Sequence, residues 1–374
     1  MRVLLTGGGT GGHVNPALAI ASTIKENLPD SVVEFVGTSK GIENRLVPRA
    51  GYAIHHVEIR GIKRSLSPSN FKTLYYVLTA PGKAKKLLRE FKPDIVIGTG
   101  GYVCWPVIKA ASSLGIPTAL HESNATPGVA VKALASKVDR IYVNFDHARE
   151  HLPNPEKVLH VGNPLLSEFK RTDKAEARRA LGIPDECKYV LLSFGGSLGA
   201  DTVNRVMLGF MKDMVKNHPE IYHIHATGSA GYEKTKAEFE AEGLDMCPNI
   251  SMSEYIYDMP LRMAAADVVV CRAGAMTISE LSLSKKCTVF IPSPNVTNNH
   301  QYKNAKVLFD EGAALLFEED SLDEGFEESL EFLLSPTGDA KRRQMEEKIS
   351  AFVVPDANKR IFEDILKLAG KSSR

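Results

Sequence analysis

The sequence predicts an α/β protein of two Rossmann-like domains, each a doubly wound parallel sheet, facing each other across a cleft. Two glycine-rich turns carry this prediction: Gly7–His13 follows an apolar strand at residues 3–5, and Gly195–Ala200 follows another at residues 190–192. A strand that ends in such a turn and leads into a helix presents backbone N–H groups and the helix dipole to an anion. Two such units in one chain indicate an enzyme with two substrates.

The first half of the chain alternates strand and helix patterns. Asn15 followed by Pro16 predicts the start of the first helix, whose apolar periodicity covers residues 17–28. Near-continuous apolar runs predict further strands, because strands covered by helices on both faces are apolar throughout. These runs lie at residues 32–36, 95–97, 118–120 and 141–143. Strands that alternate with helices in this way indicate a parallel sheet.

The second half repeats the scheme. Strands are predicted at residues 190–194, 222–226, 268–270, 288–291 and 313–317, with a helix at 175–181 and consecutive helices from about residue 322. Pro355 separates the last helix, predicted at 358–368, which we expect to pack back on the first domain. The domains are therefore predicted as residues 1–162 with 355–374, and residues 163–354.

Composition excludes several classes of protein. The 374 residues include 46 basic and 45 acidic side chains, a balance that does not indicate a nucleic-acid partner. The five cysteines form no C-x-x-C pair, and most are expected to be buried thiols in a reducing compartment. No apolar run approaches the ~20 residues that span a bilayer, and no signal-peptide pattern precedes the first strand. The prediction is a cytoplasmic protein, soluble or peripherally attached.

Metal-binding patterns are missing from the sequence. There is no D-x-D after an apolar strand, no H-E-x-x-H and no cluster of cysteine and histidine. We therefore predict no metal site and no cofactor. A pyrophosphate leaving group would then be stabilised by helix N-termini, loop N–H groups and Arg272.

The first glycine turn allows three interpretations. Gly7, Gly9 and Gly12 fit the G-x-G-x-x-G pattern of dinucleotide dehydrogenases, or they simply permit a tight turn. A dehydrogenase would need an acid at the end of the second strand, and Glu34 lies by pattern in the middle of that strand. The third interpretation is an anion- or substrate-binding turn.

His13 ends this turn at the start of the predicted helix. The positive end of the dipole disfavours a cationic imidazole there, and a neutral imidazole is suited to accept a proton. The alternative is a histidine that only caps or hydrogen-bonds the turn. The glycine-rich surroundings favour a functional role.

Two polar segments in the second half fit a sugar nucleotide. Residues 272–280 form a glycine turn and a helix start that carries Thr277, Ser279 and Glu280. An ionised carboxylate can accept hydrogen bonds from both hydroxyls of a ribose, although Glu280 could equally be an ordinary acid favoured by the helix dipole. Residues 298–301 (Asn-Asn-His-Gln) could read the hydroxyls of a sugar, or could be a polar loop with a plain N-cap.

Seven segments together resemble the MurG family of N-acetylglucosaminyltransferases, within glycosyltransferase family 28. The resemblance spans essentially the whole chain, and the segments follow one another in the family's order. They are residues 7–13, 98–103 (Gly-Thr-Gly-Gly-Tyr-Val), 121–124 (His-Glu-Ser-Asn), 162–164, 195–197, 272–280 and 300–305.

The resemblance implies a GT-B fold and a role in peptidoglycan synthesis. It implies inverting, metal-independent transfer of GlcNAc from UDP-GlcNAc, bound by the C-terminal domain, to a polyprenyl-linked acceptor, lipid I, bound by the N-terminal domain. The nucleophile would be the C4 hydroxyl of MurNAc and the product lipid II.

Residue roles follow from the same resemblance. His13 is the best candidate for the catalytic base, with Thr10 beside the acceptor and Arg272 neutralising charge on UDP. The resemblance places Asn124 near the donor sugar, Ser197 at phosphate, Glu280 at the ribose, and His300 and Gln301 at sugar hydroxyls. The other residues implied to bind substrate are Gly11, Gly12, Tyr102, Glu122, Asn163, Gly196, Ala275, Met276 and Thr277.

The chain departs from the family pattern at four places. Leu166 replaces the usual arginine, Leu198 and Ser123 each replace a glutamine, and Cys104-Trp105 replaces small residues. The changes at 166 and 198 remove polar groups expected beside UDP.

A polyprenyl acceptor implies attachment to the cytoplasmic face of the cell membrane. Apolar side chains at residues 71 and 74–78 lie among basic ones at 63, 64, 72, 83, 85, 86 and 89. Apolar groups surrounded by cations suit an anionic membrane surface, although an amphipathic core helix with a basic solvated face fits too.

Three other functions remain possible from the sequence. A related GT-B enzyme could use another lipid acceptor such as diacylglycerol, a nicotinamide dehydrogenase could use the glycine turns, and a silent sugar-nucleotide-binding protein would explain Leu166 and Leu198. The joint presence of residues 98–102 and 121–124 favours the lipid II-forming transferase over the diacylglycerol enzyme, and a retained His13 argues against a silent protein.

Overall fold

The computed structural model describes residues 1–60, 69–296, 299–322 and 325–370. The chain forms two compact units, and each is described here by itself. Unit 1 is Met1–Leu166 together with Val354–Arg374, and unit 2 is Ser167–Val353.

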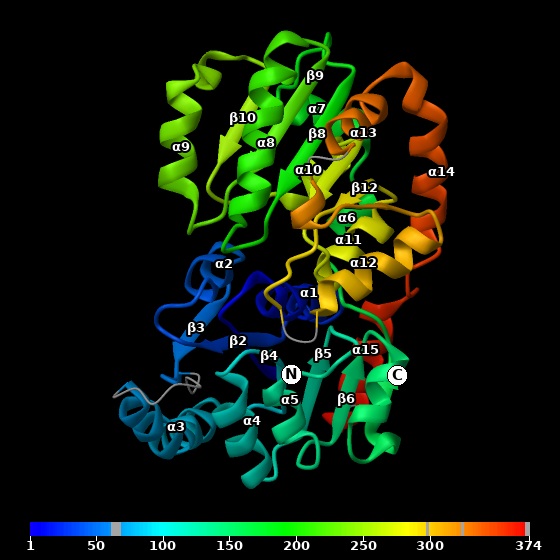
Figure 1. Cartoon of the computed structure of the whole chain (residues 1–374). Coiled ribbons are helices and arrows are strands. Elements are labelled where there is room, and N and C mark those ends of the chain that lie inside the picture. The colour runs from blue at the N-terminus through cyan, green and yellow to red at the C-terminus, as the bar shows by residue number, and fades with distance from the viewer. Residues whose placement is uncertain (61–68, 297–298, 323–324, 371–374) are drawn as a thin grey trace. The chain divides into compact units, whose positions relative to one another are not determined.

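Unit 1 is built on a seven-stranded sheet in the order β3-β2-β1-β4-β5-β6-β7, and its strand pairings are parallel. The order reverses between β1 and β4, and ligands of open parallel sheets bind at such a reversal, beyond the carboxyl ends of the strands. The strands, drawn in Figure 1, are β1 (Arg2–Gly7), β2 (Val32–Gly37), β3 (Ala53–His56), β4 (Ile95–Gly100), β5 (Thr118–Glu122), β6 (Arg140–Val143) and β7 (Val158–His160).

Helices cover this sheet, so its central strands are buried and their side chains are mostly apolar. β4 is buried over its whole length, and Val3, Leu4 and Leu5 of β1 have no exposed surface. The α-helices of unit 1 are α1 (Gly11–Asn27), α2 (Glu43–Arg49), α3 (Ser69–Phe91), α4 (Cys104–Ser113), α5 (Val129–Leu134) and α15 (Ala357–Leu368).

Unit 2 repeats the topology with six strands in the order β10-β9-β8-β11-β12-β13, again with parallel pairings. Its strands are β8 (Tyr189–Phe194), β9 (Ile221–Ala226), β10 (Ile250–Ser253), β11 (Val268–Cys271), β12 (Cys287–Phe290) and β13 (Leu315–Leu316). Its α-helices are α6 (Glu168–Arg171), α7 (Lys174–Ala180), α8 (Asp201–Asp213), α9 (Tyr232–Ala241), α10 (Met259–Ala265), α11 (Ala275–Leu283), α12 (His300–Asp310), α13 (Phe326–Leu333) and α14 (Asp339–Ser350).

The predicted doubly wound parallel sheets are confirmed, but short strands were missed. β3, β7 and β10 were not predicted, and β13 has only two residues where a longer strand was predicted. These strands lie at or near sheet edges and carry polar side chains such as His55, His160 and Ser251, so they lack an apolar run.

The predicted start of the first helix was wrong. Thr10, not Asn15, is the N-cap, and Pro16 lies inside α1. The amides of His13 and Val14 both donate to the Thr10 carbonyl, at 3.1 and 3.2 Å. The glycine turn therefore forms the first turn of the helix itself.

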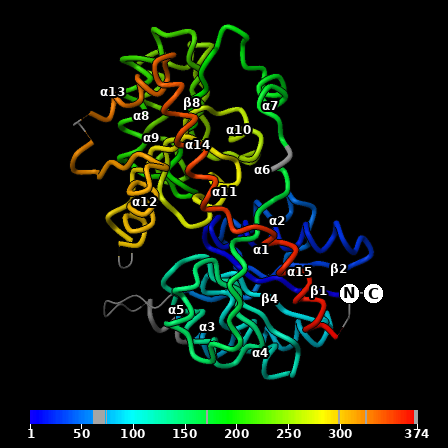
Figure 2. The backbone as a smooth tube through the Cα atoms, turned by 90° about the vertical axis from the view of Figure 1, so that its right-hand side faces the viewer, coloured from blue at the N-terminus to red at the C-terminus, as the bar shows by residue number. Residues whose placement is uncertain are grey.

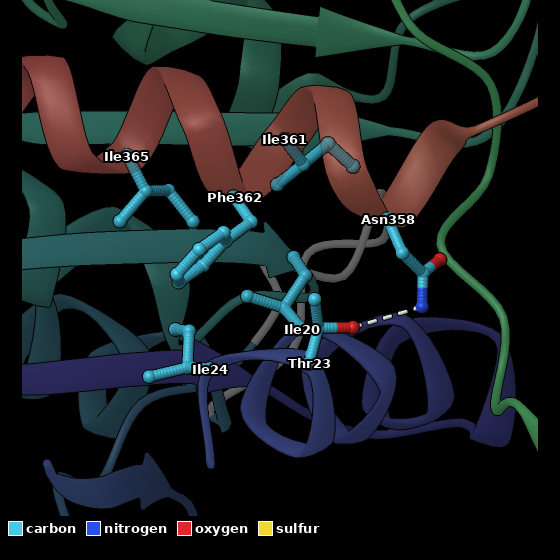
Figure 3. A pocket seen from close by; sticks show the side chains of 7 residues that line it. All are labelled: Ile20, Thr23, Ile24, Asn358, Ile361, Phe362 and Ile365. Carbon is cyan, nitrogen blue, oxygen red and sulfur yellow. Dashed lines mark hydrogen bonds between the residues drawn. The ribbon is translucent and has the colours of Figure 1, made fainter. Parts of the chain in front are cut away.

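The last helix belongs to unit 1, as the red C-terminal end of the tube in Figure 2 illustrates. α15 packs on α1, where Ile361, Phe362 and Ile365 lie against Ile20 and Ile24 around a small pocket (Figure 3). At its start, Asn358 bonds Thr23 Oγ1 at 2.9 Å. The same side chain bonds both the N–H and the carbonyl of Leu165, at 3.0 and 2.7 Å. It thereby fixes the end of the first segment of unit 1, just before the chain enters unit 2.

Four cysteines (104, 187, 271 and 287) are buried, as predicted for most of them, and Cys247 is half-buried. In the described part of the chain, no helix is both long enough and apolar enough to cross a membrane.

Candidate functional site

Two glycine turns interlock at the carboxyl ends of β1 and β4 in unit 1. The N–H of Gly8 donates to the carbonyl of Gly100 at 3.3 Å, and Thr99 Oγ1 donates to the His13 carbonyl at 2.6 Å. A Cβ atom on Gly101 would overlap the Gly8 carbonyl. Glycine is needed there, because only its backbone allows this approach and the φ of +84°.

The imidazole ring of His13 packs against the Gly100 backbone. A Cβ atom on Gly100, whose φ is +118°, would be 2.9 Å from Nε2 of His13 and would overlap Cδ2. Nδ1 is 3.1 Å from the Gly8 carbonyl and 3.4 Å from Thr10 Oγ1. A carbonyl only accepts, so Nδ1 of the neutral ring carries the proton and Nε2 keeps its lone pair. Among the described residues, Nε2 has no hydrogen-bond partner, and it is therefore available as a base.

Glu43 is a buried carboxylate behind this turn that the sequence analysis missed. It has no exposed surface and accepts from Gly9 N–H, Thr38 N–H and Thr38 Oγ1, each at 2.9 Å. A Cβ atom on Gly8 would lie 2.6 Å from Glu43 Oε1, so the glycine also makes room for the carboxylate. The Gly9 N–H is thereby used within the protein rather than offered to a ligand. Distance along the chain hid this partner, although a glutamate flanked by glycine turns is a possible signal.

A third turn of unit 1 follows β5. Glu122 is buried; its Oε1 accepts from the N–H and side-chain amide of Asn124, at 2.9 and 3.1 Å, and its Oε2 accepts from Gly128 N–H at 2.8 Å. Glu122 therefore shapes the loop that presents Asn124, and its carboxylate is occupied within the protein. The preceding residue, His121, lies 3.4 Å from the Gly162 carbonyl, which keeps the turn that contains Asn163 beside β5.

The other predicted residues of unit 1 differ in exposure. Gly12 and Thr10 are exposed in the first turn and Gly11 is buried, while the Tyr102 side chain is 61% exposed after β4. Asn163 is buried. Cys104, a departure from the family pattern, has its Sγ 2.9 Å from both the Thr6 and the Gly100 carbonyl oxygens, so its one S–H ties the β4 turn to β1.

Two glycine turns also interlock in unit 2, at the ends of β8 and β9. A Cβ atom on Gly199 would overlap the Thr227 carbonyl, and one on Gly228 would overlap Gly199. The amides of Ser229 and Ala230 donate to the carbonyls of Ser197 and Leu198, at 3.3 and 3.0 Å. The first turn, with Gly196 and Ser197, was predicted from the sequence, whereas residues 227–230 were not. Leu198 is 60% exposed on the first turn.

The third unit-2 segment is the start of α11, capped by Gly274. Ala275 and Met276 are buried in its first turn and Thr277 is half-buried. Burial raises the pKa of Glu280 from its ordinary 4.5 to about 8. No hydrogen bond among the described residues uses its carboxyl group, which contrasts with Glu43 and Glu122. A buried carboxyl with unused acceptors is suited to a pair of ligand hydroxyls.

Arg272 is engaged within unit 2. Its guanidinium forms an ion pair with Glu319 and donates to the Ile291 carbonyl at 2.9 Å. The side chains are 13% and 18% exposed, so the pair is largely shielded from water. Arg272 therefore reaches a ligand only in competition with Glu319.

The start of α12 is fastened to neighbouring loops. Gln301 Oε1 accepts from Ser293 N–H at 2.9 Å, which fixes the orientation of the side-chain amide. Asn304, which no site prediction named, donates to the Ala273 carbonyl at 3.3 Å and holds His300 and Gln301 beside the Gly274 turn. Asn298 lies outside the described residues. Across the described ranges, no three His, Cys, Asp or Glu side chains are grouped as metal ligands would be.

Comparison with known proteins assigns both halves to one family. The glycosyltransferase family 28 N-terminal domain matches residues 3–143, and the family's C-terminal domain matches residues 190–361. A UDP-N-acetylglucosamine--N-acetylmuramyl-(pentapeptide) pyrophosphoryl-undecaprenol N-acetylglucosamine transferase of Acetivibrio thermocellus is 41% identical over 98% of this chain and 99% of its own. This chain belongs to glycosyltransferase family 28. A transferase of the same name from Bacillus cereus, numbered 1, is 40% identical over 99% of this chain and all of its own.

Solved structures agree with membership of family 28. The crystal structure of Acinetobacter baumannii MurG has a TM-score of 0.67 and 27% identity, over 98% of this chain and 99% of that one. A UDP-GlcNAc 2-epimerase from Neisseria meningitidis bound to UDP-GlcNAc has the same TM-score at 15% identity, covering 98% of this chain and 100% of its own, and shows the fold alone. The predicted GT-B fold class is confirmed. The two family 28 domains contain every predicted site residue except Asn163.

Proposed function

We propose that this family 28 glycosyltransferase moves GlcNAc from UDP-GlcNAc to the MurNAc of lipid I, a polyprenyl-pyrophosphoryl acceptor, and makes lipid II for peptidoglycan synthesis. The observation that carries the proposal is identity of about 40% over the full length to transferases named for this reaction. Site chemistry supports it, because the chain keeps an available imidazole and an unused buried carboxyl group.

On the acceptor side, His13 is the proposed base. Its Nε2 would remove the proton from the C4 hydroxyl of MurNAc as that oxygen attacks the anomeric carbon of GlcNAc. Attack from the face opposite UDP inverts the anomeric centre and gives a β-1,4 bond. The Gly8 carbonyl holds the proton on Nδ1, so the ring presents the basic nitrogen, and Thr10 keeps it oriented.

On the donor side, the Glu280 carboxyl group would bind the ribose hydroxyls of UDP. The N–H groups of Gly196 and Ser197, together with the N-terminus of α11, would bind the pyrophosphate, because both present positive charge without metal. Since Glu319 already neutralises Arg272, we assign most of the charge stabilisation to these backbone groups. His300 and the Gln301 amide would bind the hydroxyls of GlcNAc.

The decisive experiment is sugar transfer from labelled UDP-GlcNAc to a lipid I analogue, with EDTA present and diacylglycerol as a parallel acceptor. A labelled disaccharide-lipid formed only from the lipid I analogue is the expected result. Transfer to diacylglycerol would instead identify the related lipid glycosyltransferase. UDP binding without transfer would indicate that the Leu166 and Leu198 departures have silenced the enzyme.

Helix α3 is the proposed contact with an anionic membrane on its cytoplasmic face. Tyr75 and Leu78 are 59% and 72% exposed on it, beside the exposed Lys83 and Lys86. Of the basic and apolar residues predicted to join them, Lys63 and Arg64 lie outside the described residues, as do the side chains of Phe71, Lys72 and Leu74.

Vesicle flotation tests this membrane proposal. The double variant Tyr75→Ser, Leu78→Ser should bind vesicles containing phosphatidylglycerol about tenfold more weakly, because exposed apolar area drives insertion. Its UDP affinity should stay unchanged. A Phe332→Ser variant, which removes an exposed aromatic of unit 2, is the matched control. Equal binding by the double variant and the parent would reject α3 as the contact.

A further inference from the structure

Unit 2 contains a buried polar chain that the proposed chemistry does not use. Ser193 of β8 and His225 of β9 are opposite each other in the strand register and share one sheet face with His223. Ser193 Oγ is 2.7 Å from both His223 Nε2 and His225 Nδ1. His225 Nε2 is 3.2 Å from Asn204 Oδ1 on α8. None of these four side chains is more than 3% exposed.

The hydrogen bonds of this buried polar chain all run in one direction, from His223 as first donor to the Thr227 carbonyl as last acceptor. Asn204 Nδ2 donates to the Thr227 carbonyl at 3.0 Å, which leaves Oδ1 facing His225 as an acceptor. His225 must therefore carry its proton on Nε2 and accept from Ser193 at Nδ1, and Ser193 accepts from His223 Nε2. Burial lowers the pKa of His225 to about 4, so both its nitrogens keep these roles at neutral pH.

The buried polar chain ends at the two interlocked glycine turns. The Thr227 carbonyl, which Asn204 holds, is the group that Gly199 approaches too closely for any side chain. A Cβ atom on Gly231 would lie 2.6 Å from Asn204 Nδ2, so the start of α9 also lies on this amide. The backbone N–H of Asn204 donates to the Ala200 carbonyl at 2.9 Å, at the end of the first turn. One residue thus connects both turns.

We propose that Asn204, oriented by His225 and Ser193, is a positioning residue for the nucleotide-binding turn at residues 195–200. It fixes the Thr227 carbonyl, against which Gly199 packs, and so sets the direction of the backbone N–H groups that receive the pyrophosphate. This inference rests on the proposed function, since it assigns that turn to the nucleotide. Loss of this positioning should weaken binding of the sugar nucleotide and leave proton transfer unchanged.

Replacement of one atom tests the assignment. Asn204→Asp keeps the shape and the acceptor for His225 but loses the donor to the Thr227 carbonyl. We expect the Kd of UDP, measured by calorimetry on the full chain, and the KM for UDP-GlcNAc to rise about tenfold, with kcat within about threefold. His223→Phe, at the end of the chain far from the turns, is the matched control and should change the Kd less than threefold.

The outcomes separate this inference from the proposed function. A parent protein that does not bind UDP contradicts the proposed function itself. A parent that binds UDP, with a folded Asn204→Asp variant of equal affinity, overturns only the positioning role, as would an equal loss in the His223 control. If Asn204→Asp does not fold, Ser193→Ala decides by the same criterion, with an expected rise in Kd of about fivefold, above the threefold limit set for the His223 control.

Discussion

His13 shows how neighbouring backbone groups can select the reactive atom of a side chain. The Gly8 carbonyl holds the proton on Nδ1, so the neutral imidazole offers Nε2, which has no other partner in the described part of the chain. Glu43 and Glu122 show the opposite case. Both are buried acids at glycine turns, and the carboxylate oxygens of both accept hydrogen bonds from backbone amides. Chemical type alone does not distinguish a reactive group from one that shapes a loop.

His13→Ala should lower kcat for transfer to a lipid I analogue by about 10²- to 10⁴-fold, the usual contribution of a general base. UDP affinity should stay within twofold, because the proposed nucleotide groups all belong to unit 2. Radiolabel transfer and calorimetry measure the two quantities. His151→Ala, an exposed histidine of unit 1, is the control. Turnover within threefold of the parent would remove His13 from the mechanism.

Glu280 makes stability depend on pH. Its folded pKa is raised to about 8 from an ordinary 4.5, so the folded state keeps a proton that the unfolded chain has lost. The unfolding free energy that this group contributes is complete below about pH 4.5. It is lost at ~1.4 kcal/mol per pH unit as pH rises to about 8. Glu280→Gln does not titrate there. Urea unfolding should show the Gln variant gaining a few kcal/mol on the parent between pH 5 and 8.

The same variant tests the ribose assignment. An ionised carboxylate accepts from both ribose hydroxyls, so UDP binding should release a proton and strengthen as pH rises towards 8. Glu280→Gln should bind UDP about tenfold more weakly at pH 8 and lose this pH dependence. Ser284→Ala, at the half-buried C-terminal end of the same helix, is the control. Identical pH profiles in the parent and Gln variant would contradict the assignment.

At the scale of elements, each unit brings two strand exits together through glycine. Gly100 and Gly101 approach the first turn of unit 1, and Gly199 and Gly228 approach each other in unit 2. The order of strands reverses at β1/β4 and β8/β11, which leaves room beyond these carboxyl ends for a ligand. Positive φ values at these positions allow the close approach that a side chain would prevent.

Gly100→Ala should reduce transfer about 100-fold, because the new methyl group would displace the His13 ring and strain a backbone with φ of +118°. Thermal unfolding and transfer kinetics measure the effect, with UDP affinity as the internal reference. Gly82→Ala is the matched control, since a Cβ atom there has no neighbour within 4 Å. Normal activity in the Gly100 variant would show that the ring position is unimportant.

At the scale of the whole molecule, the last helix closes unit 1. Asp364 of α15, 9% exposed, accepts from Arg140 at 2.8 Å and from the Tyr142 hydroxyl at 2.9 Å, both on β6. Burial and this carboxylate raise the pKa of Tyr142. More than two hundred residues separate the partners along the chain, so the first unit is complete only when its C-terminal helix is in place.

Asp364→Ala should cost about 2–4 kcal/mol of unfolding free energy, because it leaves a buried hydroxyl and a half-buried guanidinium without their acceptor. Urea unfolding followed by a probe in unit 1 measures this cost. Glu363→Ala, on the same helix, removes only an exposed ion pair with Lys359 and should change stability by no more than about 0.5 kcal/mol. Equal effects of the two variants would show that α15 is not anchored through Asp364.

Local chemistry made much of this protein readable from its sequence. Apolar runs predicted the central strands because those strands are covered on both faces, and glycine at strand exits predicted the ligand-binding edge. The order of the motifs then predicted the family. The edge strands β3, β7 and β10 escaped detection because exposed strands need no continuous apolar pattern.

Tertiary structure alone decided which polar groups remain available. Glu43, Glu122 and Glu280 are similar in the sequence, yet only Glu280 keeps its acceptors unused among the described residues. Arg272, predicted to stabilise the pyrophosphate, forms an ion pair with Glu319, 47 positions away in the sequence. The sequence determined the elements and the family through short-range patterns, whereas hydrogen bonds between distant residues decided which side chains can act. Those bonds depend on positions in space that no local pattern records.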